Sequence, residues 1–148
     1  MTFAEKYAKF LHEFGDGRAM VLSTSLNDEV TSRMMSIVHI DAKFYFQTDK
    51  TFRKYSQLIL NPKAALCIDN IQIEGSCKEL GYPPDNIDFC KSYEKCFPSS
   101  YKRYTTLKNE RLFELTPAFV KRWIYIEGIP YTEVFEIGQK SYKLEQYQ

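Results

Sequence analysis

The first regular hydrophobic pattern in the chain lies at its N-terminus. Between Thr2 and Phe14 the apolar side chains recur at three- and four-residue steps, which is the spacing of one face of an amphipathic helix. These positions are Phe3, Tyr7, Phe10, Leu11 and Phe14. Gly15 and Gly17 follow, and glycine commonly ends a helix. The pattern predicts a helix over residues 2–14.

The next three segments alternate between apolar and polar residues, as strands of a half-buried sheet do. They read AMVLSTSL (19–26), VTSRMMSIVHI (30–40) and KFYFQT (43–48). The turn residues NDE separate the first two, and Asp41 lies in the turn before the third. These runs predict a meander of antiparallel strands.

A short helix is expected after this meander. The side chain of Asp49 or Thr51 can cap its start, and the helix reaches to about Leu60. Asn61-Pro62 ends it, because the residue before a proline avoids the helical region.

The second half of the chain predicts more strands around a helical insertion. AALCID (64–69) and IQIEGSCKEL (71–80) form strands joined by a tight turn at Asp69-Asn70, after which Pro83-Pro84 break the sheet. PDNIDFCKSYEKCF (84–97) reads as a helix, followed by a helical turn over residues 99–106. The segments 112–128, 131–137 and 141–147 supply two or three closing strands, with Pro117 at a bulge or an edge.

This order of elements favours one class of fold. At least six strands are separated by tight turns, and helices occur only at the start, after the third strand and in the middle. We therefore expect a mainly β protein with some α, in the form of an antiparallel β-barrel with an N-terminal helix and short peripheral helices, rather than a doubly wound parallel sheet.

Composition narrows the function classes. A chain of 148 residues suits a single domain, and 44% hydrophobic residues with a net charge of +1 create no dominant electrostatic field. Binding to nucleic acid or to a membrane surface is therefore disfavoured. Aromatic residues make up 16% of the chain, which fits a strand-rich core or a planar ligand. Charged residues near the N-terminus and the lack of a long apolar run predict a cytoplasmic location.

Cysteines and histidines suggest no metal site. Cys67, Cys77, Cys90 and Cys96 lack C-x-x-C spacing, which favours reduced structural thiols, and Cys90 and Cys96 would fall on different faces of a helix. His12 and His39 lie apart from any cluster of ligand-type residues. We assign no catalytic base.

The basic pair Arg53-Lys54 is the strongest candidate for ligand binding. It falls near the start of the short helix, where backbone N–H groups favour an anion, and Thr48 adds a hydroxyl donor. By the two-residue alternation of a strand, Arg33 faces the same way as Met35. An arginine aligned with an apolar neighbour needs a partner for its charge. A phosphate group fits this set. The alternative is a solvated helix face and an arginine exposed at a sheet edge.

The order and spacing of these residues resemble the FMN-binding split-barrel family of pyridoxamine 5′-phosphate oxidase. The resemblance covers roughly residues 18–81. It is carried by Arg33-Met34, Phe46-Gln47-Thr48, Arg53-Lys54, Gln57-Leu58 and Asn61-Pro62. It implies one domain over residues 1–148, a Greek-key-like split barrel, with FMN at the interface of a homodimer.

The resemblance also implies a set of cofactor-binding residues. Around the phosphate of FMN it places Arg33, Thr48, Arg53 and Lys54, with Gln47 in the same motif. The backbone of Met34, Met35 and Ser36 would run along the isoalloxazine ring. Asn70 stands where the family often has glutamine. Trp123 falls near a family tryptophan that contacts the flavin from the other subunit, and its alternative role is a barrel-core aromatic.

The chain also departs from the family pattern. It reads RWIYIEGIPYTEVFEI where pyridoxamine phosphate oxidases carry an R-L-H-type motif near the C-terminus, so the vitamin phosphate is not the expected substrate. In this it resembles shorter general-stress-protein-like and nitroimidazole-reductase-like relatives. We expect an FMN-dependent oxidoreductase that passes electrons or hydride to a small acceptor. Alternatives are a non-enzymatic, stress-related flavin carrier or sensor, and a barrel for single-stranded nucleic acid, which the near-neutral charge disfavours.

Overall fold

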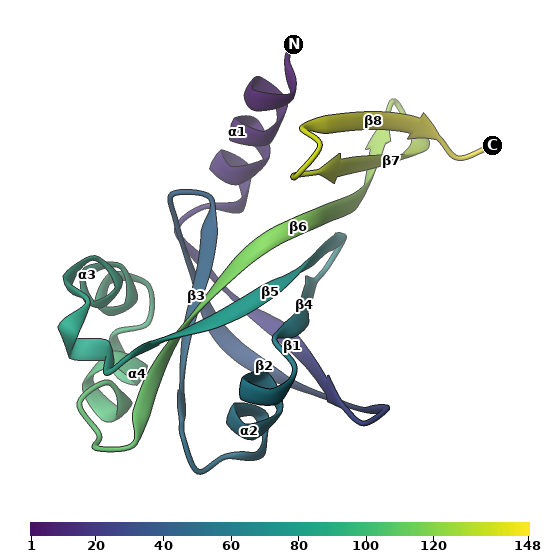
Figure 1. Cartoon of the computed structure of the whole chain (residues 1–148). Helices are drawn as coiled ribbons and strands as arrows, with labels where there is room; N and C mark the ends of the chain where they lie inside the picture. Colours follow the sequence, from purple (N-terminus) through teal and green to yellow (C-terminus); the bar gives the residue numbers. More distant parts are fainter.

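A computed structural model describes the whole chain, residues 1–148, and its centre is a closed antiparallel β-barrel (Figure 1). Around the barrel the strands run in the order β3-β2-β1-β4-β5-β6, and pairing of β3 with β6 closes it. Their bounds are β1 (Gly17–Leu26), β2 (Glu29–Ile40), β3 (Lys43–Asp49), β4 (Lys63–Ile68), β5 (Ile71–Gly81) and β6 (Glu110–Ile126). The predicted mainly β split barrel is confirmed.

Two further strands extend the sheet beyond the barrel. The distal half of β6 pairs with β7 (Ile129–Glu136), which pairs with β8 (Ser141–Gln146). This β7–β8 hairpin projects from the barrel beside α1 (Phe3–Phe14), as Figure 1 shows. The prediction of two or three closing strands is thus confirmed, with three.

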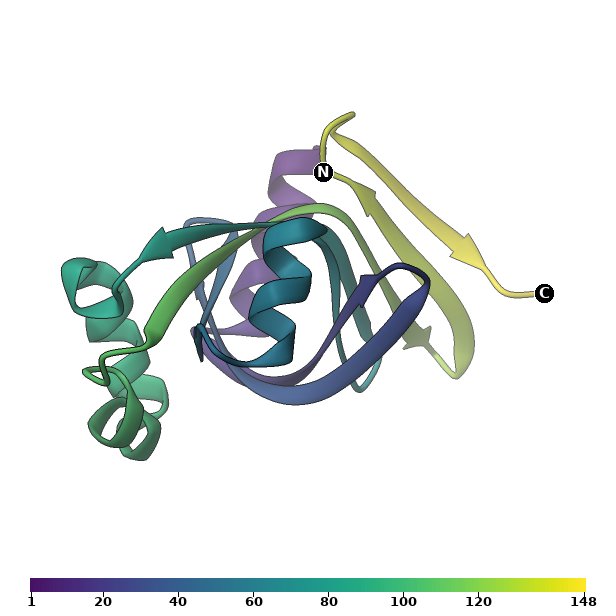
Figure 2. The same cartoon turned by 60° about the horizontal axis from the view of Figure 1, so that its bottom comes forward.

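The remaining helices lie around the barrel. Helix α2 (Arg53–Leu60) crosses one open end (Figure 2), and η1 (Pro83–Asp85), α3 (Ile87–Cys96) and α4 (Pro98–Tyr104) form a group at one side. None of the helices is long and apolar enough to cross a membrane.

Local side-chain bonds explain how the first two helices begin. In α1, the Thr2 side chain accepts a hydrogen bond from the Glu5 backbone N–H while the Glu5 carboxylate bonds back to Thr2. The predicted cap of α2 by Asp49 or Thr51 is wrong. Its N-cap is Phe52, which makes no side-chain bond, because the Asp49 carboxylate instead accepts from the backbone N–H and hydroxyl of Thr51, at 2.8 and 2.7 Å.

The barrel interior is packed with aromatic and aliphatic side chains. Alternation along the strands turns every second residue inward, so Leu22, Phe44 and Phe46 are fully buried. The rings of Phe46 and Phe113 stack across the β3–β6 pair at 5.4 Å between centroids. These contacts hold the closing pair in register.

A smaller apolar cluster lies outside the barrel wall. Val38 of β2 and Leu112 of β6 pack there against Phe89 and Tyr93 of α3. These four residues are buried, and Tyr101 of α4 packs against them. The cluster therefore holds α3 and α4 beside the end of β3 and the start of β6. That position brings the helices to the candidate site described below.

The predicted irregularity at Pro117 is a bulge. The β5–β6 register shifts between Glu74 and Gly75, and Gly75 lies opposite Pro117. A Cβ atom on Gly75 would lie 2.3 Å from the Thr116 carbonyl oxygen. Glycine is therefore required on the partner strand.

A partly buried ion cluster joins α1 to the distal sheet. The Arg122 guanidinium bonds to Glu133 on β7 and, at 2.7 Å, to Glu13 on α1. The Tyr142 hydroxyl also donates to Glu133, whose side chain is only 9% exposed. The Glu133 carboxylate thus joins β6, β7 and β8, and Arg122 adds α1 to the cluster through Glu13.

Loss of the Arg122 charge should destabilise the fold strongly. Arg122→Met keeps most of the side-chain volume but leaves the Glu133 carboxylate buried without its ion pair, so the free energy of unfolding should fall by about 3 kcal/mol. Urea unfolding measures it. The control Arg103→Met changes an exposed arginine of α4 and should stay within about 0.5 kcal/mol. A loss below about 1 kcal/mol for Arg122→Met would contradict the proposed role of the cluster.

Candidate functional site

The end of β3 carries two buried polar side chains with unsatisfied donors. Gln47 and Thr48 are 6% and 3% exposed. Thr105 donates to Gln47 Oε1 at 3.1 Å, but Gln47 Nε2 and the Thr48 hydroxyl make no hydrogen bond. Buried polar groups without partners are uncommon, because each loses its bonds to water. Two neighbouring ones indicate a place for a polar ligand.

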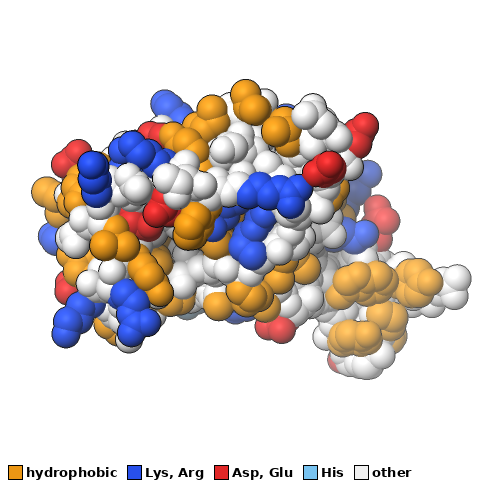
Figure 3. Space-filling view, turned by 90° about the horizontal axis from the view of Figure 1, so that it is seen from below, with side chains coloured by type: hydrophobic (Ala, Val, Ile, Leu, Met, Phe, Trp, Pro, Cys, Tyr) orange, Lys and Arg blue, Asp and Glu red, His pale blue; other side chains and the backbone are white.

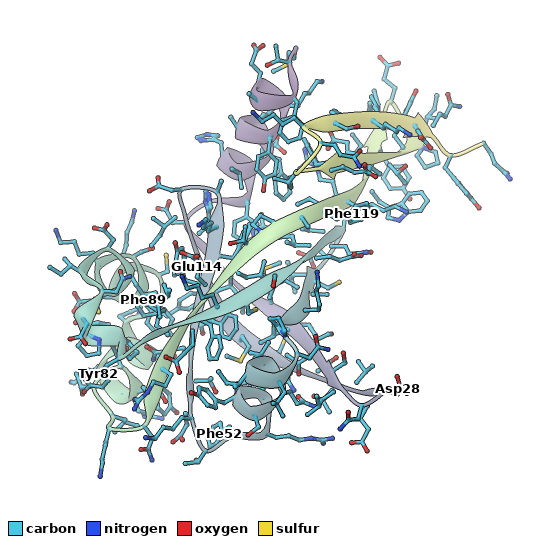
Figure 4. All side chains as sticks on the ribbon, viewed as in Figure 1. Asp28, Phe52, Tyr82, Phe89, Glu114 and Phe119 are labelled. Carbon is cyan, nitrogen blue, oxygen red and sulfur yellow. The ribbon has the colours of Figure 1, made fainter.

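A cavity of about 160 Å³ opens beside these two residues. Its walls come from β3, the start of α2, both side helices and the start of β6. The lining residues are Gln47, Thr48, Asp49, Phe52, Lys54, Tyr93, Tyr104 and Glu110. We call this cavity the β3-end cleft. In Figure 4, Phe52 marks its α2 side and Phe89 lies between α3 and the strands.

Lys54 supplies positive charge to the cleft. Its ammonium lies 4.8 Å from the centre of the Phe52 ring and makes no ion pair within the chain. Burial lowers the pKa of Lys54, and the charge of Arg33 lowers it further. A partly desolvated ammonium at a helix N-terminus favours an anion. Arg53, the first residue of α2, is exposed and pairs with Glu29 at 2.8 Å.

Figure 3 looks onto the end of the barrel that α2 covers. Lys and Arg side chains lie in the middle of this face and also toward its left side, among apolar and acidic side chains.

Two carboxyl groups also face this region, with different proton affinities. Glu110 lies directly opposite Asp49 in the β3–β6 register and is 6% exposed. Burial raises the pKa of Glu110 to about 7, and the nearby Asp49 charge adds to the shift while Lys54 opposes it. The bonds from the Thr51 side chain and backbone lower the pKa of Asp49. Near neutral pH, Asp49 is therefore ionised, whereas Glu110 is present in both its protonated and its ionised form.

Arg33 is held inside the barrel mouth by hydrogen bonds from its side chain. Its guanidinium donates to the Leu22 carbonyl at 3.1 Å and to the hydroxyls of Thr24 and Thr31 at 2.9 and 2.6 Å. Those hydroxyls in turn donate to Gln57 Oε1 of α2. Arg33 does lie on an unpaired edge of β2, which pairs with β3 only from Val38 to Ile40. The alternative of a solvent-exposed side chain there is wrong, because the guanidinium has three hydrogen-bond partners. Arg33 lies close enough to Lys54 for their charges to affect one another.

The other residues of the β2 motif occupy both faces of the strand. Met34 is 56% exposed on the outer face, whereas Met35 packs against the main core. Ser36 is half-buried on the same face as Met34. On the side away from β1, this stretch of β2 is not paired with β3, so its backbone edge is free beside Arg33.

Asn70 and Trp123 lie away from the β3-end cleft of their own chain. They contact each other, because Asn70 Nδ2 donates to the Trp123 backbone carbonyl at 2.6 Å and the Trp123 backbone N–H donates to the Asn70 backbone carbonyl at 3.2 Å. Thr48 pairs with Arg111, and the run from Arg111 to Trp123 spans roughly 40 Å along β6. Trp123 is 40% exposed, so the alternative of a barrel-core aromatic is wrong.

Sequence reasoning missed five residues of the cleft, which are Asp49, Phe52, Tyr93, Tyr104 and Glu110. Tyr93, Tyr104 and Glu110 follow no motif, and they reach the site only because α3, α4 and β6 pack beside β3. The one available signal was the position of Glu110 at the start of an apolar strand, where a carboxyl group is unusual. That pattern alone does not show that Asp49 lies opposite Glu110 on the neighbouring strand.

The cysteines and histidines lie outside the cleft. All four cysteines are free. His39 uses both ring nitrogens, one beside the Gly15 carbonyl at 3.1 Å and one with the Ala42 backbone N–H at 3.3 Å. No cluster of three or more His, Cys, Asp or Glu side chains could hold a metal ion.

Comparison with known proteins identifies the fold. No protein-family model and no curated protein sequence matches the chain. Among solved structures, General Stress Protein 26 from Bacillus anthracis str. Sterne is 24% identical with a TM-score of 0.60, over 81% of this chain and 92% of that one. A pyridoxamine 5′-phosphate oxidase-related, FMN binding protein from Nostoc punctiforme PCC 73102 is 13% identical with a TM-score of 0.63, over 99% and 93%.

A third structure extends the comparison. A NimC/NimA family protein from Clostridium acetobutylicum is 14% identical with a TM-score of 0.56, over 97% of this chain and 94% of that one. At these identities the likeness establishes the fold. The chain has the split-barrel fold shared by pyridoxamine 5′-phosphate oxidase-related FMN-binding proteins, general stress protein 26 and NimC/NimA family proteins.

The unsatisfied hydroxyl of Thr48 allows a direct test of the cleft. Thr48→Val removes a hydroxyl that makes no bond, so the free energy of unfolding of the ligand-free protein should change by less than about 0.5 kcal/mol or rise. Thr24→Val is the matched control, because Thr24 is equally buried but bonds to Gln57 and Arg33, and it should lose about 1–3 kcal/mol. Urea unfolding in phosphate-free buffer compares them. Equal losses would show that Thr48 has a structural partner.

Proposed function

We propose that this chain is an FMN-binding oxidoreductase that holds the phosphate of FMN in the β3-end cleft. The observation that carries the proposal is the convergence of three donors without partners, Gln47 Nε2, the Thr48 hydroxyl and the Lys54 ammonium, in one small cavity. Phosphate oxygens accept such bonds. The names of the structural neighbours, which include an FMN binding protein, support the same cofactor.

The residues present fit a phosphate group. Thr48 and Lys54 would contact it directly, while Arg33 and Arg53 would add positive charge from the barrel mouth and the first turn of α2. Gln47 would donate through its free amide N–H. The backbone from Met34 to Ser36, which β3 does not pair with, would then run along the ring.

The chain would position and shield the cofactor. FMN supplies the transfer of hydride or electrons when it is bound. Phe52 and Tyr104 line the cleft and limit the access of water to the phosphate, which strengthens the charge interactions there. The acceptor would be a small molecule. Pyridoxamine 5′-phosphate remains an unexpected substrate, because the R-L-H-type motif is missing from the C-terminal strands.

A homodimer would complete the site. Trp123 lies far along β6 from the cleft of its own chain, and Asn70 of the β4–β5 turn is bonded to it, so their contribution would reach the flavin of the partner. The projecting β7–β8 hairpin and the end of β6 carry exposed apolar side chains, visible at the right of Figure 3. They are Trp123, Tyr125, Ile126, Ile129, Leu144 and Tyr147. A second copy would cover such a patch.

A non-enzymatic flavin carrier or sensor is the second candidate. The likeness to General Stress Protein 26 favours it, since that name describes a stress response rather than a reaction. Turnover separates the two functions. Rapid reoxidation of the reduced flavin by a small acceptor supports the enzyme, and an inert bound flavin supports the carrier.

Removing the Lys54 charge should weaken the binding of FMN much more than the binding of riboflavin. Hydrogen bonds to charged groups contribute about 1.5–3 kcal/mol, so Lys54→Ala should weaken FMN roughly ten- to a hundredfold. Riboflavin has the same ring without the phosphate and should bind the variant almost as it binds the wild type. Flavin fluorescence titration measures both. The control Lys102→Ala alters an exposed lysine of α4 and should leave both affinities unchanged. An equal loss of affinity for FMN and riboflavin would show that the phosphate does not bind in this cleft.

The emission of Trp123 should report the dimer and the flavin together. Trp123 is the single tryptophan, so its fluorescence has no other source. If it reaches the flavin of the partner, added FMN should quench it, and sedimentation should show a dimer. Tyr125→Asp, on the same exposed patch, should weaken the dimer and the quenching together. A monomer that binds FMN tightly with unchanged Trp123 emission would rule out the shared site.

A further inference from the structure

Glu110 has no role in the phosphate contacts proposed above, although it lines the same cleft. Glu110 is 6% exposed, and it lines the cleft together with the unpartnered donors of Gln47 and Thr48. No side chain donates a hydrogen bond to it. A carboxylate there would repel a phosphate, whereas a protonated carboxyl would offer it one more donor. The protonation state of Glu110 therefore matters to any anion that enters.

The charged and titratable groups around Glu110 come from every neighbouring element. They are Asp49 on β3, Lys54 on α2, Tyr93 on α3 and Tyr104 on α4, with Arg33 behind Lys54. The guanidinium of the adjacent Arg111 bonds instead to the carbonyls of Lys108 and Glu110. Lys54 is thus the only cation that acts on the Glu110 carboxyl at short range.

We propose that Glu110 takes up a proton when a phosphate monoester enters the β3-end cleft and then donates its O–H to a phosphate oxygen, so that FMN binding is coupled to pH. The proton comes from solvent and forms an O–H bond on the carboxylate, and no other bond changes. In the free protein the charges of Glu110 and Lys54 attract each other without forming an ion pair, and the entering phosphate would become the first direct partner of that ammonium. This inference rests on the proposed function, because it concerns the same phosphate site.

The proton affinities around the cleft support this division of roles. Burial and the Asp49 charge raise the pKa of Glu110 to about 7, so the group is neutral below that pH and charged above it. The bonds from Thr51 keep Asp49 ionised throughout this range, because they lower its pKa. The second ionisation of a phosphate monoester lies near pH 6, below the range in which Glu110 titrates. Above about pH 7, Glu110 therefore changes charge while Asp49 and the phosphate keep theirs.

The affinity for FMN should fall as the pH rises above 7. Below pH 7 Glu110 already carries its proton, and FMN binds without uptake. Above pH 7 each bound FMN must draw one proton from solvent, so its affinity should fall by up to about tenfold for each pH unit. Between pH 6 and pH 8.5 the wild type should lose roughly thirtyfold in FMN affinity. Riboflavin lacks the phosphate and should show no such loss.

The test compares FMN and riboflavin affinities of three proteins between pH 6 and pH 9 by flavin fluorescence. Glu110→Gln keeps the size of the side chain and a hydrogen-bond donor but carries no charge, so its FMN affinity should stay almost constant with pH. Glu114→Gln is the matched control on the same strand. Glu114 bonds to Lys43 and Tyr45, away from the cleft, and lies far from Phe52 in Figure 4. This variant should keep the pH dependence of the wild type.

Proton uptake by the wild type gives a second measurement that needs no variant. Calorimetry of FMN binding at pH 8 in two buffers of different ionisation enthalpy should show close to one proton taken up per FMN. Equal pH dependence in wild type and Glu110→Gln, or no uptake at pH 8, would overturn the role of Glu110 while leaving the FMN site in place. FMN that binds no better than riboflavin at any pH would overturn the phosphate site and this inference together.

Discussion

The pairing of β3 with β6 is the contact on which the rest of the structure depends. It closes the barrel, stacks Phe46 on Phe113 in the core and sets Thr48 and Asp49 opposite Arg111 and Glu110. The same pairing carries the start of β6 under α3 and α4, which a small apolar cluster fixes against the barrel wall. The β3-end cleft exists where these strands end and α2 begins. A shift of this register by one residue would turn Glu110 away from the cleft.

The contrast between satisfied and unsatisfied polar groups separates structure from function in this barrel. At the barrel mouth, Thr24 and Arg33 share a network with Gln57 in which each polar group has a partner. At the far end of the molecule, Arg122 and Glu133 are equally well paired. The Gln47 amide and the Thr48 hydroxyl have no such partners, although the cost of burying them is similar. A bound phosphate would offset that cost.

Much of the fold could be predicted from local patterns, because strand alternation and turn residues act over short stretches of chain. The succession of helices and strands along the chain followed from them, as did an irregularity at Pro117, and the motif around Thr48 and Lys54 identified one wall of the cleft. The cap of α2 was mispredicted, since Asp49 bonds to Thr51 and leaves Phe52 at the helix start. Glu110 was missed for a different reason. Its neighbour Asp49 is distant in the sequence, and only closure of the barrel sets the two side by side.

The most direct measurement of the central claim, that the β3-end cleft holds the phosphate of FMN, is the identity of the chromophore carried by the purified protein. Denaturation should release it, and mass spectrometry with absorption should identify it and count it per chain. We predict a yellow protein that releases FMN, at one molecule per chain. A protein that is colourless as purified and takes up no FMN when it is supplied in excess would contradict the account.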